Sequence, residues 1–220
     1  MCALINIALM VTHLDRTESE KKRKKIPIQA HHTLYGNTTR SLNLNSTCTS
    51  YQSNVPRHKR FITIGGLFNT GTNLLSYLLL KNCHANFLPS TLWGKHNPVE
   101  ARHTFTRTLY AGSRIDDVHQ TLTVVMIKDP LTWGLSMCKN PYEARFPAAT
   151  SCPNLFADDV AVTYNVDSPW GAKTYKGLVG MWNEWCGDYF SVLGEFPFVM
   201  VRFEDLVFRP EETVSDICAC

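Results

Sequence analysis

Residues 61–80 contain two apolar runs separated by a glycine-rich turn. The first run, Phe61-Ile-Thr-Ile64, has the aromatic and β-branched composition of a strand. The second places leucines at spacings of three and four (Leu74, Leu75, Leu78, Leu79), which is the period of a helix. A strand, a glycine-rich loop and a helix in this order predict the start of an α/β domain.

The turn between these runs has the composition of an anion-binding loop. Glycines allow successive N–H groups to point inward, and the helix N-terminus adds partial positive charge. Gly66 and Gly71 have the spacing of a Walker A loop, but Thr72 and Asn73 stand where that loop has its Lys and its magnesium-binding hydroxyl. The loop is therefore predicted to bind a phosphate monoester without a metal. In the alternative, Thr70, Thr72 and Asn73 only cap the helix.

Residues 121–127 form a continuous β-branched and apolar run, which is typical of a buried parallel strand. The run ends at Lys128 and passes into a predicted helix over 131–139, for which Asp129 is the expected cap. Ser136 lies about two turns into that helix. We expect Lys128 and Ser136 to face one anionic group.

Lys95 and His96 follow a short strand-like stretch, residues 87–93. Ligands of open α/β sheets bind at the carboxyl ends of strands, where this pair could supply a cation and a base. The alternative is an exposed loop without a role. Further along the chain, the irregular segment 140–177 is a candidate acceptor-binding loop.

The last part of the chain returns to regular patterns. Apolar and aromatic side chains at helical spacing over 178–192 predict a helix whose aromatic stripe lies in the core. An apolar strand is expected over 196–202, and a further helix is expected from Glu211.

Charge divides the chain into two parts. Residues 1–60 carry a net charge of +7, whereas residues 61–220 carry −4. Because the basic surplus lies in the polar N-terminal part, the sequence does not suggest a nucleic-acid-binding fold. We predict an apolar segment and disordered stem over 1–59 and one folded domain over 60–220.

Signals for cellular location disagree. An apolar run of about twelve residues opens the chain, shorter than the ~20 of a spanning helix, and membrane association through it is one possibility. The basic run 21–25 favours the cytoplasm, whereas the glycosylation acceptors Asn37 and Asn45 favour the secretory lumen. The Golgi lumen is slightly preferred. In a lumen, Cys138 and Cys152 could form a disulfide.

Three segments, in this order, resemble the sulfotransferase family. Gly66-Leu-Phe-Asn-Thr-Gly-Thr-Asn73 is similar to its 5′-phosphosulfate loop, and Ile127-Lys-Asp-Pro-Leu-Thr-Trp-Gly-Leu-Ser136 to its 3′-phosphate segment. Val201-Arg-Phe-Glu-Asp-Leu206 resembles a strand and turn that precede a late helix. The resemblance covers roughly residues 60–217. It implies a three-layer P-loop-like fold with a central, mainly parallel sheet flanked by helices.

The resemblance also implies a reaction. A sulfuryl group would pass from 3′-phosphoadenosine 5′-phosphosulfate to a hydroxyl or amine of an acceptor, with a carbohydrate mildly preferred and no metal required. The residues implied for the 5′-phosphate are Thr70, Gly71, Thr72 and Asn73, and those for the 3′-phosphate are Lys128 and Ser136. Gly66 and Asn69 of the same loop are further expected cofactor-binding residues.

The chain also departs from the family pattern. Asn69 stands where the loop usually has Lys or Arg, so Lys95 and His96 are the expected source of the missing cation and of the base. The C-terminal basic, glycine-rich segment of many members has no counterpart before Cys220, so the domain is expected to lack its C-terminal part. Two alternatives remain: a nucleotide-binding protein without catalysis, and a P-loop small-molecule kinase.

Overall fold

The computed structural model describes residues 41–104, 108–110, 113–115, 117–145, 161–164 and 172–220. Residues 39–220 form one compact unit. This unit begins well before the boundary predicted at residue 60, because Ser41–Leu42 (β1) and Leu44–Asn54 (α3) belong to it. The apolar run, the basic run and Asn37 lie outside the described residues.

The centre of the unit is a five-stranded sheet in the order β1-β9-β6-β2-β3. Four strands are parallel: β2 (Phe61–Gly66), β3 (Asn86–Leu88), β6 (Thr121–Ile127) and β9 (Phe198–Arg202). The edge strand β1 is antiparallel to β9. The predicted α/β class with a mainly parallel sheet is confirmed.

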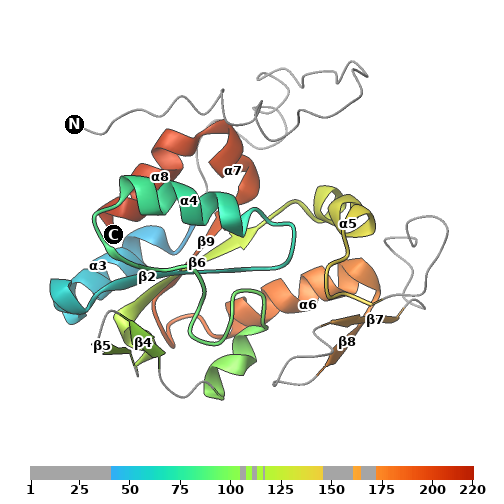
Figure 1. Ribbon diagram of the computed structural model, residues 1–220, viewed down its shortest axis with the longest axis horizontal. Helices are drawn as coiled ribbons and strands as arrows, with labels where there is room; N and C mark the ends of the chain where they lie inside the picture. Colours follow the sequence, from blue (N-terminus) through green and yellow to red (C-terminus); the bar gives the residue numbers. More distant parts are fainter. Residues whose placement is uncertain (1–40, 105–107, 111–112, 116, 146–160, 165–171) are drawn as a thin grey trace. The chain divides into compact units, whose positions relative to one another are not determined.

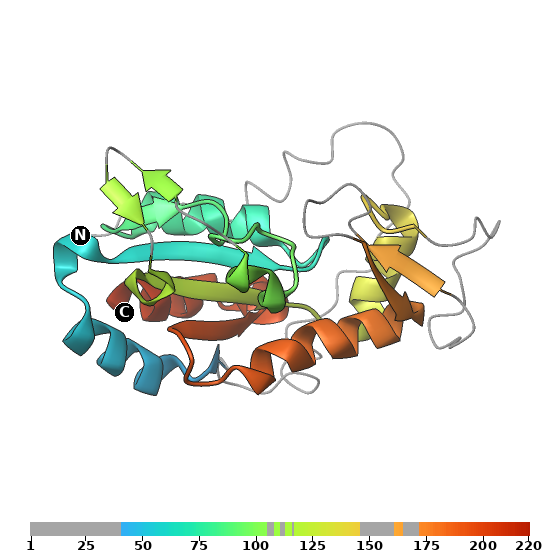
Figure 2. The same cartoon turned by 90° about the horizontal axis from the view of Figure 1, so that it is seen from below.

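Helices cover both faces of the sheet. Figures 1 and 2 show α4 (Thr72–Asn82) and α8 (Pro210–Ala219) over one face and α3 and α6 (Gly177–Ser191) over the other. Trp185 and Tyr189 of α6 are fully buried in one cluster with Val125 and Phe198 of the sheet. The aromatic stripe of this segment is therefore part of the core, as predicted.

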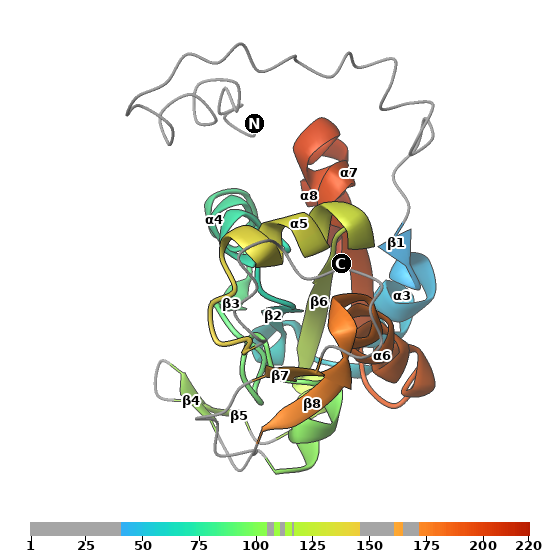
Figure 3. The same ribbon diagram turned by 90° about the vertical axis from the view of Figure 1, so that its right-hand side faces the viewer.

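Smaller elements surround the sheet. Helix α5 (Pro130–Lys139) and the β-hairpin of β7 (Ala161–Tyr164) and β8 (Lys173–Lys176) lie at the end of the sheet where β6 finishes (Figures 1 and 3). Most of the predicted acceptor loop, 140–177, lies outside the described residues. The remaining elements are η1 (Arg57–Lys59), η2 (Val99–His103), β4 (Thr108–Tyr110), β5 (Ser113–Ile115), η3 (Val118–Gln120) and α7 (Phe203–Phe208).

Two disulfides join α8 to the rest of the unit. Cys48 of α3 is bonded to Cys220, and Cys83, which follows α4, is bonded to Cys218. The sequence did not predict either bond. The bond considered between Cys138 and Cys152 involves a residue outside the described part of the chain.

Candidate functional site

The loop between β2 and α4 makes a tight turn with two residues at positive φ. Asn69 (φ 62°) and Gly71 (φ 88°) lie in the left-handed region. A side chain at position 71 is also excluded by space, because a Cβ atom there would lie 2.4 Å from the ring of Phe203. Gly71 is the N-cap of α4, so the first N–H groups of this helix, which have no acceptor within it, lie at the end of the loop.

The threonines of the loop are structural. Thr70 and Thr72 are almost fully buried, and the Thr70 hydroxyl donates a 2.7 Å hydrogen bond to the Leu67 carbonyl. The N-cap position of α4 is occupied by Gly71, which has no side chain, and the alternative in which Thr70, Thr72 and Asn73 only cap the helix stays a prediction. The Thr70 N–H donates to the Leu67 carbonyl (3.4 Å), so an anion in this loop would contact the N–H groups of Thr72 and Asn73.

Lys95 and His96 lie directly against the loop. The Gly66 N–H donates to the Lys95 carbonyl (3.0 Å), and His96 Nδ1 lies 2.6 Å from the Gly66 carbonyl oxygen. Lys95 Nζ donates to Asn73 Oδ1 at 3.0 Å. The structure therefore brings together the loop and the pair that the sequence proposed as cation and base.

The contact with Gly66 determines the tautomer of His96. A carbonyl oxygen only accepts, so Nδ1 carries the hydrogen and Nε2 carries the lone pair in the neutral ring. Burial and, to a lesser extent, the charge of Lys95 lower the pKa of His96 to about 4, against the opposing hydrogen bond to Gly66. Burial also lowers the pKa of Lys95. His96 is thus neutral at physiological pH.

Lys128 and Ser136 are also brought together, as predicted. Lys128 Nζ donates to Ser136 Oγ at 2.9 Å, and Ser136 Oγ donates to the Thr132 carbonyl. Asp129 caps α5 by accepting from the N–H groups of Leu131 and Thr132. Burial lowers the pKa of Lys128, and the nearby carboxylates of Glu204 and Asp129 oppose this shift.

Two further residues at this site had no role assigned from the sequence. The ring of Phe203 lies next to Gly71, and Lys128 Nζ lies 4.9 Å from its centroid. Glu204 is buried and accepts a hydrogen bond from the Asp129 N–H. The sequence of segment 201–206 shows a resemblance to a family motif. Its contacts with Gly71 and Lys128 become visible only in the three-dimensional structure.

Asn69 has a different environment from the one expected of a phosphate ligand. Its side-chain amide donates to the Asn140 carbonyl (2.8 Å) and to Met137 Sδ (3.2 Å) at the end of α5. Trp133 adds a second link between α5 and the loop, by donating from Nε1 to the Phe68 carbonyl. The Asn69 side chain thus fixes the loop to α5. Its amide nitrogen is already bonded there, in place of a contact with a phosphate.

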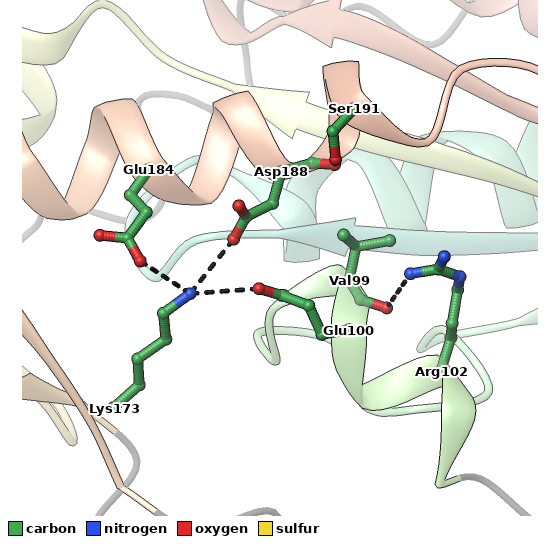
Figure 4. Close-up of polar contacts among 7 residues, drawn as sticks. All are labelled: Val99, Glu100, Arg102, Lys173, Glu184, Asp188 and Ser191. Carbon is green, nitrogen blue, oxygen red and sulfur yellow. Dashed lines mark hydrogen bonds and ion pairs between the residues drawn. The ribbon is translucent and has the colours of Figure 1, made fainter.

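A group of charged residues supports the segment that follows Lys95 and His96. Figure 4 shows Lys173 of β8 among Glu184 (2.9 Å) and Asp188 (3.2 Å) of α6 and Glu100 (3.2 Å) of η2. Burial and the neighbouring Glu100 raise the pKa of Asp188 to about 6, although Lys173 opposes the shift. These contacts join the β7–β8 hairpin to α6 and η2.

Among the described residues, no group of three or more His, Cys, Asp or Glu side chains is placed to hold a metal ion. None of the described helices has the length and apolar character needed to cross a bilayer.

Comparisons of the chain with protein-family models, curated proteins and solved structures gave no match. The function of this site must therefore be inferred from its own geometry.

Proposed function

We propose that this unit is a P-loop-like sulfotransferase domain that uses 3′-phosphoadenosine 5′-phosphosulfate. The observation that carries the proposal is the position of Lys95, whose ammonium lies 3.0 Å from the side chain of Asn73 in the first turn of α4. The phosphate-type loop has no cation of its own, and Lys95 supplies one from a different segment. This arrangement fits transfer from a phosphate leaving group.

The two ends of the nucleotide correspond to two parts of the site. The backbone of Gly71, Thr72 and Asn73 suits the 5′-phosphate, because N–H groups and a helix N-terminus converge there. Lys128 and Ser136 suit the 3′-phosphate, with one positive charge and one hydroxyl already 2.9 Å apart. The ring of Phe203 lies between the two parts, next to Gly71 and to Lys128 Nζ.

The transfer step follows from the placement of His96 and Lys95. The acceptor oxygen attacks sulfur and forms a new S–O bond, while the bond from sulfur to the 5′-phosphate oxygen breaks. His96 Nε2 takes the acceptor proton, and the electron pair of the broken bond stays on the phosphate. Lys95 stabilises that developing charge. The products are a sulfated acceptor and adenosine 3′,5′-bisphosphate.

The acceptor class and location form part of the proposal. Two disulfides in one small unit are typical of an oxidising compartment. Asn45, a glycosylation acceptor, is exposed in the first turn of α3. Both features support a luminal enzyme, for which the Golgi and a carbohydrate acceptor are the preferred setting.

A second candidate is a nucleotide-binding protein of this fold without catalysis. It is favoured by the low pKa of His96, since a general base is most effective when its pKa is near the working pH. Binding of an anionic phosphosulfate beside His96 would raise the pKa of His96 and make it a better base. Both candidates bind the nucleotide, and only the enzyme turns it over. A small-molecule kinase would instead require magnesium.

The proposal is tested by following release of adenosine 3′,5′-bisphosphate from the phosphosulfate donor in the presence of a panel of glycan acceptors without metal. We expect acceptor-dependent release by the parent chain and a large loss in Lys95→Ala and His96→Ala. Lys139→Ala, an exposed cation at the end of α5, is the matched control. Equal rates in the parent chain and both site variants would refute the roles of Lys95 and His96.

A further inference from the structure

A basic hollow lies at the opposite end of the sheet from the candidate site. It encloses about 1130 Å³ and is formed where η1 meets β2, where α4 ends and where α8 finishes. Two guanidinium groups (Arg57, Arg60) and two imidazoles (His58, His84) line it, and no Asp or Glu side chain in the described part of the chain does. The side chains of this wall therefore include cations and no acidic group.

The distribution of charge along the sequence explains this surface. Residues 41–99 contain five Lys or Arg and no Asp or Glu, whereas residues 100–220 contain ten Lys or Arg against sixteen Asp or Glu. The first of these segments supplies most of the lining of the hollow. The segment that forms most of the wall thus contains no Asp or Glu that could pair with its cations.

The walls of the hollow are held in a fixed arrangement. The disulfides Cys48–Cys220 and Cys83–Cys218 join α8 to α3 and to the end of α4 on either side of it. Arg60 is fixed by hydrogen bonds to the carbonyls of Val55 (2.7 Å) and Gln52 (2.6 Å). Arg57 and His84, in contrast, are exposed. A rigid concave wall with an exposed guanidinium and exposed imidazoles is suited to binding an anionic ligand.

The remaining lining indicates the type of ligand. The amide nitrogens of Gln52 and Asn86 donate to backbone carbonyls of the wall, which leaves the amide oxygens. Apart from the buried Tyr51, the apolar side chains are few and mostly small (Ile62, Ala85, Ala219). A protein partner usually fills such a surface with apolar and aromatic side chains, for which this hollow offers little contact. A flat lipid surface cannot reach the residues inside a concave hollow. A chain rich in hydroxyl and anionic groups fits these donors better.

We propose that this hollow binds an anionic polysaccharide bearing sulfate or carboxylate groups. The proposal does not depend on the proposed sulfuryl transfer, because the hollow lies at the amino end of β2 and the phosphate-type loop at its carboxyl end. Arg57 would make the main ionic contact, the His84 ring would add a hydrogen bond, and the amide oxygens of Gln52 and Asn86 would accept from hydroxyls.

The test measures the affinity of the full chain for a size-defined heparin oligosaccharide by fluorescence anisotropy at fixed salt. Arg57→Glu should weaken binding by about tenfold or more, the loss expected for a charge-assisted contact. Lys139→Glu makes the same charge change on the exposed surface of α5 and should change the affinity by less than about twofold.

Two further measurements distinguish a polysaccharide site in the hollow from attraction to the overall charge of the chain. Arg57→Gln/His84→Gln removes the donors without adding negative charge and should also weaken binding, while the unfolding midpoint and the response to adenosine 3′,5′-bisphosphate stay at their parent values. Equal weakening in Arg57→Glu and Lys139→Glu would overturn the proposal. Tighter binding of polyglutamate or of phosphatidylserine vesicles than of heparin would overturn it as well.

Discussion

The two ends of the parallel sheet are built in different ways. At the carboxyl end, hydrogen bonds join Lys95 and His96 to the loop, Lys128 to Ser136, and the loop to α5 and Asn140. At the amino end, two disulfides, two arginines and two histidines lie around the end of α8. We propose transfer chemistry for the first end and binding of an anionic ligand for the second. Each end can therefore be changed while the other serves as the control.

The largest effect is expected from the disulfides. Each closes a long loop, with sequence separations of 172 and 135 residues, so its removal greatly increases the entropy of the unfolded chain. We expect a loss of about 2–5 kcal/mol in the free energy of unfolding for Cys48→Ala/Cys220→Ala, and a similar loss for Cys83→Ala/Cys218→Ala. Urea unfolding with and without reductant measures this. An unchanged midpoint in reductant would show that the amino end does not depend on these bonds.

The next effect concerns the cation at the carboxyl end. Lys95→Ala should lower kcat for sulfuryl transfer by about 10²–10³, as expected for removal of one group that stabilises the leaving charge. Steady-state kinetics with saturating donor measure the change, and Arg57→Ala at the amino end is the control. A change in KM alone would indicate that Lys95 only binds the donor.

Lys128 should act on one phosphate of the nucleotide. Lys128→Ala is expected to weaken binding of adenosine 3′,5′-bisphosphate by about 10–100-fold, because it removes a charge-assisted hydrogen bond. Binding of adenosine 5′-monophosphate should change little, since that nucleotide has no 3′-phosphate. Calorimetric titration of both nucleotides measures the difference, and an equal loss for both would place Lys128 elsewhere on the nucleotide.

The smallest effect follows from the pKa of His96. The pKa is about 4 in the folded chain and about 6.5 in the unfolded chain, so protons bind preferentially to the unfolded state between these values. Stability should therefore fall with decreasing pH through this range, by about 2 kcal/mol between pH 7 and pH 4.5. Urea unfolding across this range should show a weaker pH dependence in His96→Gln. The same dependence in both chains would mean that His96 is not buried as described.

The sequence predicted the carboxyl end better than the amino end for a physical reason. The loop and Lys128 follow strands with clear local patterns, and parallel strands bring their carboxyl ends to one edge, so the residues there could be grouped in advance. Residue 60 was taken as the start of the domain because residues 41–59 are polar and lack periodicity. Helix α3 forms there because Tyr51 packs in the interior and Cys48 bonds to Cys220.

The roles of site residues that depend on tertiary contacts also could not be predicted from the sequence. Phe203 approaches Gly71 across a separation of more than a hundred residues, and the Asn69 amide turns to α5 because Asn140 and Met137 lie there. No local pattern records such contacts. The disulfides have the same origin, since eight cysteines allow many pairings and spacing alone selects none.

A thermal-shift titration with adenosine 3′,5′-bisphosphate, beside ATP with and without magnesium, tests the central claim most directly. A ligand that binds only the folded state raises the midpoint, and at 100 times its Kd it stabilises by about 2.7 kcal/mol. We predict a rise with the bisphosphate that does not need metal and that is lost in Lys128→Ala. No shift with the bisphosphate, or a shift only with ATP and magnesium, would contradict the account.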